Sequence, residues 1–192
     1  MARLTIPVRL RWSDIDGYQH VNNAKMFTIL EEVRIAAFWA STPGDAEFDG
    51  GAVAGGGPVA GGGPAGSEAT APEGAATDDG ARPGTKVLAT GPGSGTNTYI
   101  ARQEIEYLAP VPYTLRPLPV ELWISRLGGA SLDVCYEIPG PDGVAARAMT
   151  TIVLIDEKSG RPRRMTEAER ATWAAFLDAP VQFRRRPDGT DA

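Results

Sequence analysis

The sequence has few of the residue types that support redox, metal or nucleophilic chemistry. Its 192 residues include one cysteine, Cys135, and one histidine, His20. A single cysteine cannot form an internal disulfide, and with one histidine it cannot supply a zinc site built from these residue types. A serine or cysteine nucleophile needs a base, so one imidazole also disfavours protease-type triads. We therefore expect neither a metal nor another cofactor.

Long apolar runs and a positive charge excess are also absent. No stretch approaches the roughly 18 apolar residues of a membrane span, and the N-terminal segment alternates apolar and basic residues, unlike a signal sequence. The net charge is −5 and the pI is near 5.0, whereas nucleic-acid binders are broadly basic. These features predict a cytoplasmic protein that binds neither nucleic acid nor membrane.

Glycine and proline are plentiful but unevenly distributed. Residues 41–98 hold 16 of the 23 glycines and 6 of the 16 prolines, and they include the hexapeptide VAGGGP twice in tandem. Such a segment has little to bury and a high entropic cost of ordering, so we expect a flexible insertion at about 41–98. A spacer and a lid over a binding site are both compatible with it. The remaining residues suit a single domain.

Apolar periodicity predicts one long helix early in the chain. Residues 24–40 are apolar on most sides and leave a narrow polar stripe, so the helix should be largely covered. Asn22 or Asn23 can cap its start. The expected stripe consists of Lys25, Glu31, Glu32 and Arg34.

Strand patterns flank this helix and the insertion. Residues 4–12 alternate apolar and polar side chains, and Pro7 favours an edge position or a bulge. Thr166 and Glu169 form a capping box that opens a short helix at about 166–178. Four further strands are expected at 99–111, 118–127, 131–138 and 144–155. This order indicates an α+β fold, an antiparallel sheet of about five strands with one central helix packed on it.

Polar residues gather immediately before the long helix. Two carboxylates, an imidazole and two amides lie within ten residues: Asp14, Asp16, His20, Asn22 and Asn23. At the rim of a partly desolvated space a carboxylate can act as a base, and the unpaired N–H groups of a helix start can polarise a carbonyl. From these residues alone, a purely structural role in capping the helix is about as compatible with the pattern as a catalytic role.

These residues carry a family resemblance. The segment DIDGYQHVNN, with Glu31-Glu32 in the helix, resembles the DxDxxxHVNNxxYxxxxEE signature of hotdog-fold acyl thioesterases of the 4-hydroxybenzoyl-CoA thioesterase type. The runs ARQEIEYLAP at 101–110 and GRPRRM at 160–165 resemble the central strand and C-terminal end of that family. The resemblance implies a hotdog fold, a sheet wrapped round one long helix, and hydrolysis of acyl thioesters, with acyl-CoA as the expected substrate.

The resemblance also implies roles for individual residues. The general base or nucleophile falls on Asp16, while Asp14 is expected to shape the loop. The backbone N–H that polarises the carbonyl falls near Asn23, and His20 orients the loop or assists proton transfer. The family implies a homodimer or homotetramer with the pocket between subunits. The expected substrate-binding residues are Tyr18, Asn22, Met26 and Phe27.

Two departures from the family pattern keep alternatives open. Residues 19–23 also resemble plant-type acyl-carrier-protein thioesterases, but Tyr18 stands where their asparagine would be. Met26 stands where tyrosine is common. Together with Phe27 and Trp12 it suggests an apolar acyl pocket, which core packing explains equally well. The alternatives are an acyl-ACP thioesterase and a non-hydrolytic acyl-CoA-binding or dehydratase hotdog protein. The position of His20 before the helix favours hydrolysis over dehydration.

Overall fold

The computed structural model describes residues 3–39, Leu88 and residues 94–184. The chain divides into one unit formed by residues 1–40 and 84–192 and a second formed by residues 41–83. The second unit, and with it most of the expected insertion, lies outside the described residues. In the first unit, the elements are β1 (Leu4–Val8), a 3-10 turn (Trp12–Asp14), α1 (Asn23–Phe38), β2 (Thr96–Tyr107), β3 (Leu118–Leu127), β4 (Ser131–Gly140), β5 (Gly143–Asp156) and α2 (Glu167–Ala174).

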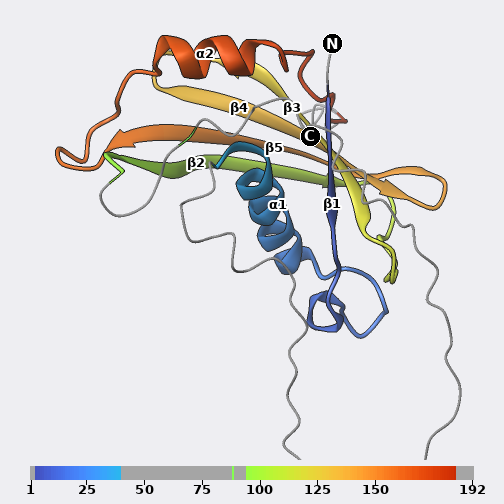
Figure 1. Cartoon of the computed structure of the whole chain (residues 1–192). Coiled ribbons are helices and arrows are strands. Elements are labelled where there is room, and N and C mark those ends of the chain that lie inside the picture. Colours follow the sequence, from blue (N-terminus) through green and yellow to red (C-terminus); the bar gives the residue numbers. More distant parts are fainter. Residues whose placement is uncertain (1–2, 40–87, 89–93, 185–192) are drawn as a thin grey trace, which may run out of the picture. The chain divides into compact units, whose positions relative to one another are not determined.

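The five strands form one antiparallel sheet in the order β1-β3-β4-β5-β2 (Figure 1). β1 and β2 are therefore the edge strands. The expectation that Pro7 belongs to an edge strand is confirmed, and Pro7 pairs with Pro119 of β3 at a register position where neither residue can donate a backbone hydrogen bond. The expected α+β architecture is also confirmed.

Helix α1 packs its apolar side chains against one face of the sheet and forms the main core. Met26, Leu30 and Val33 are fully buried, as the spacing predicts. Two features differ from the expectation. The side chain of Arg34, assigned to the polar stripe, is only 3% exposed, and Phe27 and Ile35 are among the exposed large apolar residues. A helix that meets a sheet on one side cannot cover every apolar position.

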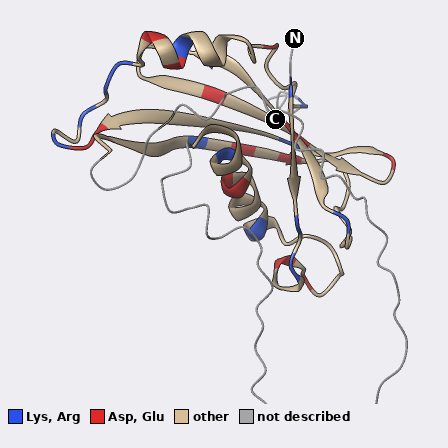
Figure 2. Ribbon diagram, in the orientation of Figure 1, with Lys and Arg blue, Asp and Glu red and all other residues tan. Residues whose placement is uncertain are grey.

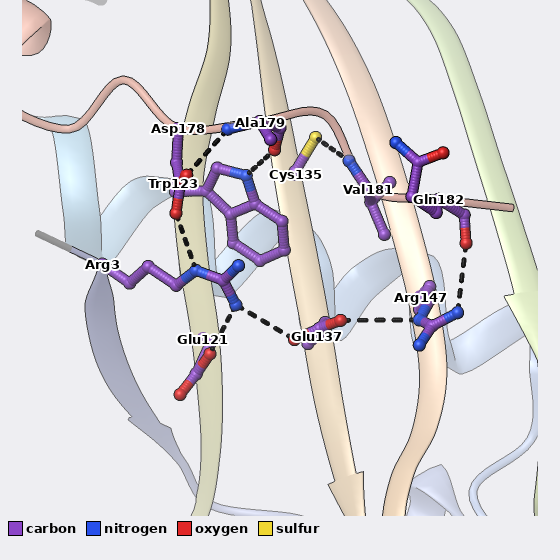
Figure 3. A network of polar contacts seen from close by, with 10 residues as sticks. All are labelled: Arg3, Glu121, Trp123, Cys135, Glu137, Arg147, Asp178, Ala179, Val181 and Gln182. Atoms are coloured by element: carbon purple, nitrogen blue, oxygen red, sulfur yellow. Dashed lines mark hydrogen bonds and ion pairs between the residues drawn. The ribbon is translucent and has the colours of Figure 1, made fainter. Parts of the chain in front are cut away.

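The opposite face of the sheet is covered by the segment that follows α2. Trp123, Cys135 and Val181 form a second apolar cluster there, and burial raises the pKa of the Cys135 thiol. The indole Nε1 of Trp123 donates to the carbonyl of Ala179 at 2.7 Å. Arg3 stacks on the Trp123 ring and pairs with acidic residues of two strands and the tail (Figure 3). These acidic partners are Glu121, Glu137 and Asp178.

Several element boundaries differ from the sequence expectation. β1 ends at Val8, and Trp12 lies in the 3-10 turn with 74% of its surface exposed, so it contributes to neither core nor pocket. β2 begins at Thr96, within the range 41–98 expected for the insertion, and Leu88 in that range is buried in the core. α2 ends at Ala174 and not near residue 178, because the backbone at 176–178 bonds to β3 instead.

Two features of the described residues bear on binding to nucleic acid and to membranes: the distribution of charge and the length of the helices. Figure 2 shows basic and acidic residues interspersed along α1 and the sheet instead of a continuous basic face. None of the helices in the described ranges is long and apolar enough to cross a membrane. The cytoplasmic location stays a prediction.

Candidate active site

The loop between the 3-10 turn and α1 is closed by backbone pairing. Ile15 bridges Val21, and the N–H of Asp16 donates to the carbonyl of His20 at 2.8 Å. Asp14, which is 9% exposed, accepts the N–H of Arg11 through Oδ2 at 2.8 Å. Its carbonyl accepts the N–H of Asn22 at 2.8 Å. Asp14 therefore shapes the loop and fixes the point where α1 begins.

Asp16 is held in place from within the same loop. Its Oδ1 accepts the backbone N–H groups of Tyr18 at 2.8 Å and His20 at 3.1 Å. The turn is completed by Gln19, whose N–H donates to the Asp16 carbonyl at 3.1 Å and whose φ of 64° is in the left-handed region. Within the part of the chain described, Oδ2 of Asp16 accepts no hydrogen bond, so this oxygen is available to a ligand.

Helix α1 begins beside this carboxylate. Asn22 is the N-cap, and its side chain accepts the N–H of Ala24 at 2.9 Å. The N–H of Met26 makes the first bond of the helix, to the Asn22 carbonyl at 3.0 Å. The N–H groups of Asn23 and Lys25 precede that bond and have no partner among the residues described. They form the positive end of the helix dipole.

A cavity of about 350 Å³ brings these groups together. Asp16, His20, Asn23 and Met26 line it from the loop and α1, and residues 107–111 line it from the end of β2 and the segment beyond. The N–H of Val21 donates to the Val111 carbonyl at 2.8 Å, which ties the two walls together. A carboxylate, an imidazole and a helix N-terminus thus share one space.

The structure separates the predicted site residues into two groups. The three predicted catalytic residues, Asp16, His20 and Asn23, line the cavity, as does Met26. Tyr18 does not line it and is 82% exposed. Asn22 and Phe27 do not line it either, because Asn22 turns its side chain back to cap the helix and Phe27 is on an exposed side of α1.

Sequence reasoning missed Tyr107 as a wall of the cavity. Its hydroxyl donates to the carbonyl of Asn23 at 3.2 Å, and burial raises its pKa, so it remains a neutral donor near pH 7. This contact joins β2 to the first turn of α1 across 84 residues of sequence. In the sequence, the only sign of this role is that an aromatic residue ends the strand before Leu108-Ala109-Pro110, which is a weak signal.

The arrangement suits attack on a carbonyl carbon. A carboxylate with a free oxygen can remove a proton from water or attack directly, and the free N–H groups of a helix start can stabilise an oxyanion. The described residues contain no group of three or more acidic, histidine or cysteine side chains placed to hold a metal ion.

Comparison with known proteins relates this arrangement to one family. The sequence profile described as the thioesterase-like superfamily matches residues 10–172. No curated protein matches the chain. Among solved structures, a predicted thioesterase from Bacillus stearothermophilus is 20% identical, with a TM-score of 0.60 over 94% of this chain and 100% of that one.

Two further solved structures carry more specific descriptions. A DHNA-CoA thioesterase from Staphylococcus aureus is 12% identical, with a TM-score of 0.58 over 91% of each chain. A thioesterase from Thermus thermophilus, complexed with coenzyme A and Zn, is 20% identical, with a TM-score of 0.51 over 91% of this chain and 92% of that one. At these identities the likeness shows a shared fold, the hotdog arrangement expected from the sequence.

Proposed function

The chain belongs to the thioesterase-like superfamily, and we propose that it hydrolyses acyl-CoA thioesters with Asp16 as the reacting carboxylate. One observation carries the proposal: Asp16, whose Oδ2 accepts no hydrogen bond from the described residues, and Asn23 at the start of α1 line the same cavity of about 350 Å³. A relative of this fold from Thermus thermophilus was solved with coenzyme A, which supports this thiol carrier.

The proposed reaction places the thioester carbonyl against the first turn of α1. Asp16 takes a proton from water as the hydroxide attacks the carbonyl carbon, and the N–H groups of Asn23 and Lys25 stabilise the oxyanion. The C–S bond then breaks and the thiolate of coenzyme A takes up the proton. In the nucleophilic variant Asp16 attacks directly, and water then cleaves the resulting anhydride.

His20 has a supporting role in this proposal. Its backbone N–H donates to Oδ1 of Asp16 at 3.1 Å, which leaves Oδ2 directed to the reaction. Its imidazole also lines the cavity and can assist the proton transfer to the leaving thiolate.

We further propose that the protein assembles as a homodimer or homotetramer. β2 is an edge strand whose outer backbone groups have no neighbouring strand in the described sheet, and Ile100 and Tyr107 on it are exposed. Phe27 and Ile35 expose further apolar surface on α1. A second copy can cover both surfaces.

The test is the release of free thiol from a panel of acyl-CoA thioesters. Asp16→Asn keeps an oxygen that can accept the Tyr18 and His20 N–H groups, so the loop is retained while the base is lost. We expect kcat to fall by roughly a hundredfold or more. Asp142→Asn, at an exposed turn between β4 and β5, is the matched control and should retain full activity.

Three outcomes would contradict the proposal in different ways. Near-normal activity of Asp16→Asn would remove Asp16 from catalysis. Cleavage of acyl-ACP but not of acyl-CoA would show that the acyl carrier protein, and not coenzyme A, carries the acyl group. Binding of acyl-CoA without any release of thiol would favour the non-hydrolytic alternative.

A further inference from the structure

Arg34 is a charged side chain in the core, and the part of the chain that the structure describes places no opposite charge beside it. It is 3% exposed, and among the described residues no carboxylate lies within ion-pair distance of it. With the described residues it forms one hydrogen bond, a long one from Nη1 to the hydroxyl of Thr150 at 3.5 Å, and its Nε forms none with them. Arginine cannot lose its proton in a protein, so a buried guanidinium needs an anion or several acceptors.

The groups around Arg34 are rich in donors and poor in acceptors. Nε2 of Gln103 donates to the same Thr150 oxygen at 3.3 Å, so two donors share one acceptor. The hydroxyl of Tyr136 completes no hydrogen bond in the described part. Burial raises the pKa of Tyr136 to about 12, against smaller opposite effects of the neighbouring Arg34 and Thr150 side chains, so the phenol stays neutral. A carboxylate, which only accepts, complements this set.

Arg34 also borders an open space. A cavity of about 200 Å³ lies between α1 and β2 and is lined by Glu31, Arg34, Ile35, Trp39, Thr98 and Ile100. Glu31 at its rim is exposed and forms no ion pair with Arg34. The guanidinium thus lines a space between α1 and β2 into which a ligand can extend.

The proposed reaction centre lies farther along the same two elements, at the start of α1 and the end of β2. In the sheet Gln103 pairs with Thr150, and Tyr107 at the catalytic cavity pairs with Ala146. The two pairs are four positions apart along β2, which is a distance of about 13 Å along a strand. Ile105 lies between the two pairs on β2, and Met26 of α1 lines the catalytic cavity; both are apolar and pack in the main core. An acyl chain with an aliphatic middle and a charged end fits this sequence of surfaces.

We propose that Arg34, with Gln103 and Thr150, binds a carboxylate at the far end of the acyl group, so that the preferred substrates are thioesters of dicarboxylic acids. This rests on the proposed thioester hydrolysis and adds the substrate class. The planar guanidinium offers two parallel N–H groups to a carboxylate, and its burial makes that interaction selective against a methyl end.

The experiment compares matched pairs of substrates. For the wild-type protein we expect kcat/KM to be at least about tenfold higher for one of adipoyl-, suberoyl- or dodecanedioyl-CoA than for its hexanoyl, octanoyl or dodecanoyl counterpart. Arg34→Gln should lose that preference and still cleave the neutral thioester. Arg164→Gln, an exposed arginine away from the space between α1 and β2, is the matched control, and Glu31→Gln should strengthen the preference by removing a negative charge from the rim.

A wild-type protein that cleaves neutral and carboxylated thioesters equally overturns the proposal, whether or not Arg34→Gln folds. Thermal unfolding with free suberate distinguishes a site for a free dicarboxylic acid from a site for the carboxylate at the end of an acyl group. If suberate stabilises the wild type but not Arg34→Gln, and no acyl preference exists, the site binds a free acid and the substrate assignment is wrong. If no thioester is cleaved, the proposed function fails, while suberate still reports on the site.

Discussion

Two aspartates only two positions apart have different structural tasks. Asp14 is nearly buried and uses both its side chain and its carbonyl to fix the loop to the start of α1. Asp16 is half-buried and keeps one carboxylate oxygen free. A substitution at each should therefore separate stability from catalysis.

We expect Asp14→Ala to lower the free energy of unfolding by about 1–3 kcal/mol, because the N–H of Arg11 loses its acceptor. Asp16→Asn should change it by less than about 0.5 kcal/mol, since the loop bonds are retained. Urea unfolding of both variants and the wild type measures this difference. An Asp16→Asn protein destabilised as much as Asp14→Ala would show that Asp16 is structural.

At the scale of elements, α1 and α2 both begin with good N-caps, but only α1 begins at the cavity, with Asn23 in its wall. Asn22 opens α1, and Thr166 opens α2 in a capping box with Glu169. Sequence alone indicates both caps, since each depends on residues within four positions of one another. Which cap faces a ligand is decided by the packing of α1 against the end of β2.

Asn22→Ala and Thr166→Ala should each cost about 1 kcal/mol of stability. We expect kcat of Asn22→Ala to fall by roughly tenfold, because a frayed first turn no longer aims its N–H groups at the oxyanion. Thr166→Ala should keep its kcat. Measuring thiol release and thermal unfolding for both variants tests this, and equal loss of kcat in the two would contradict a special role for the α1 start.

For the whole molecule, the two faces of the sheet differ in how they are covered. The tail after α2 crosses the outer face, where the Nη1 of Arg147 donates to the Gln182 carbonyl at 3.1 Å and Arg3 joins β1 to the tail (Figure 3). The seam between α1 and β2 keeps exposed apolar side chains at an open sheet edge. Self-association should therefore occur at this seam.

We expect Ile100→Lys to shift the protein from an oligomer toward the monomer, because it places a charge in the apolar seam. Leu115→Lys is the matched control, since Leu115 is an exposed apolar residue in the loop between β2 and β3. Light scattering on a sizing column measures the mass of each variant. An unchanged mass of Ile100→Lys, or a monomeric wild type, would contradict assembly through this seam.

The sequence by itself determined the features that depend on short-range patterns. Three such features are the period-two alternation in β3, β4 and β5, an asparagine N-cap at position 22 or 23, and the polar cluster from Asp14 to Asn23. All are local, so neighbours along the chain suffice to predict them. Only the tertiary structure decided how distant segments combine. It placed Tyr107 against Asn23, left Trp12 and Tyr18 in solvent and buried Arg34 beside Thr150. Helical periodicity shows which residues share a face but not which face meets the sheet, and burial depends on that contact.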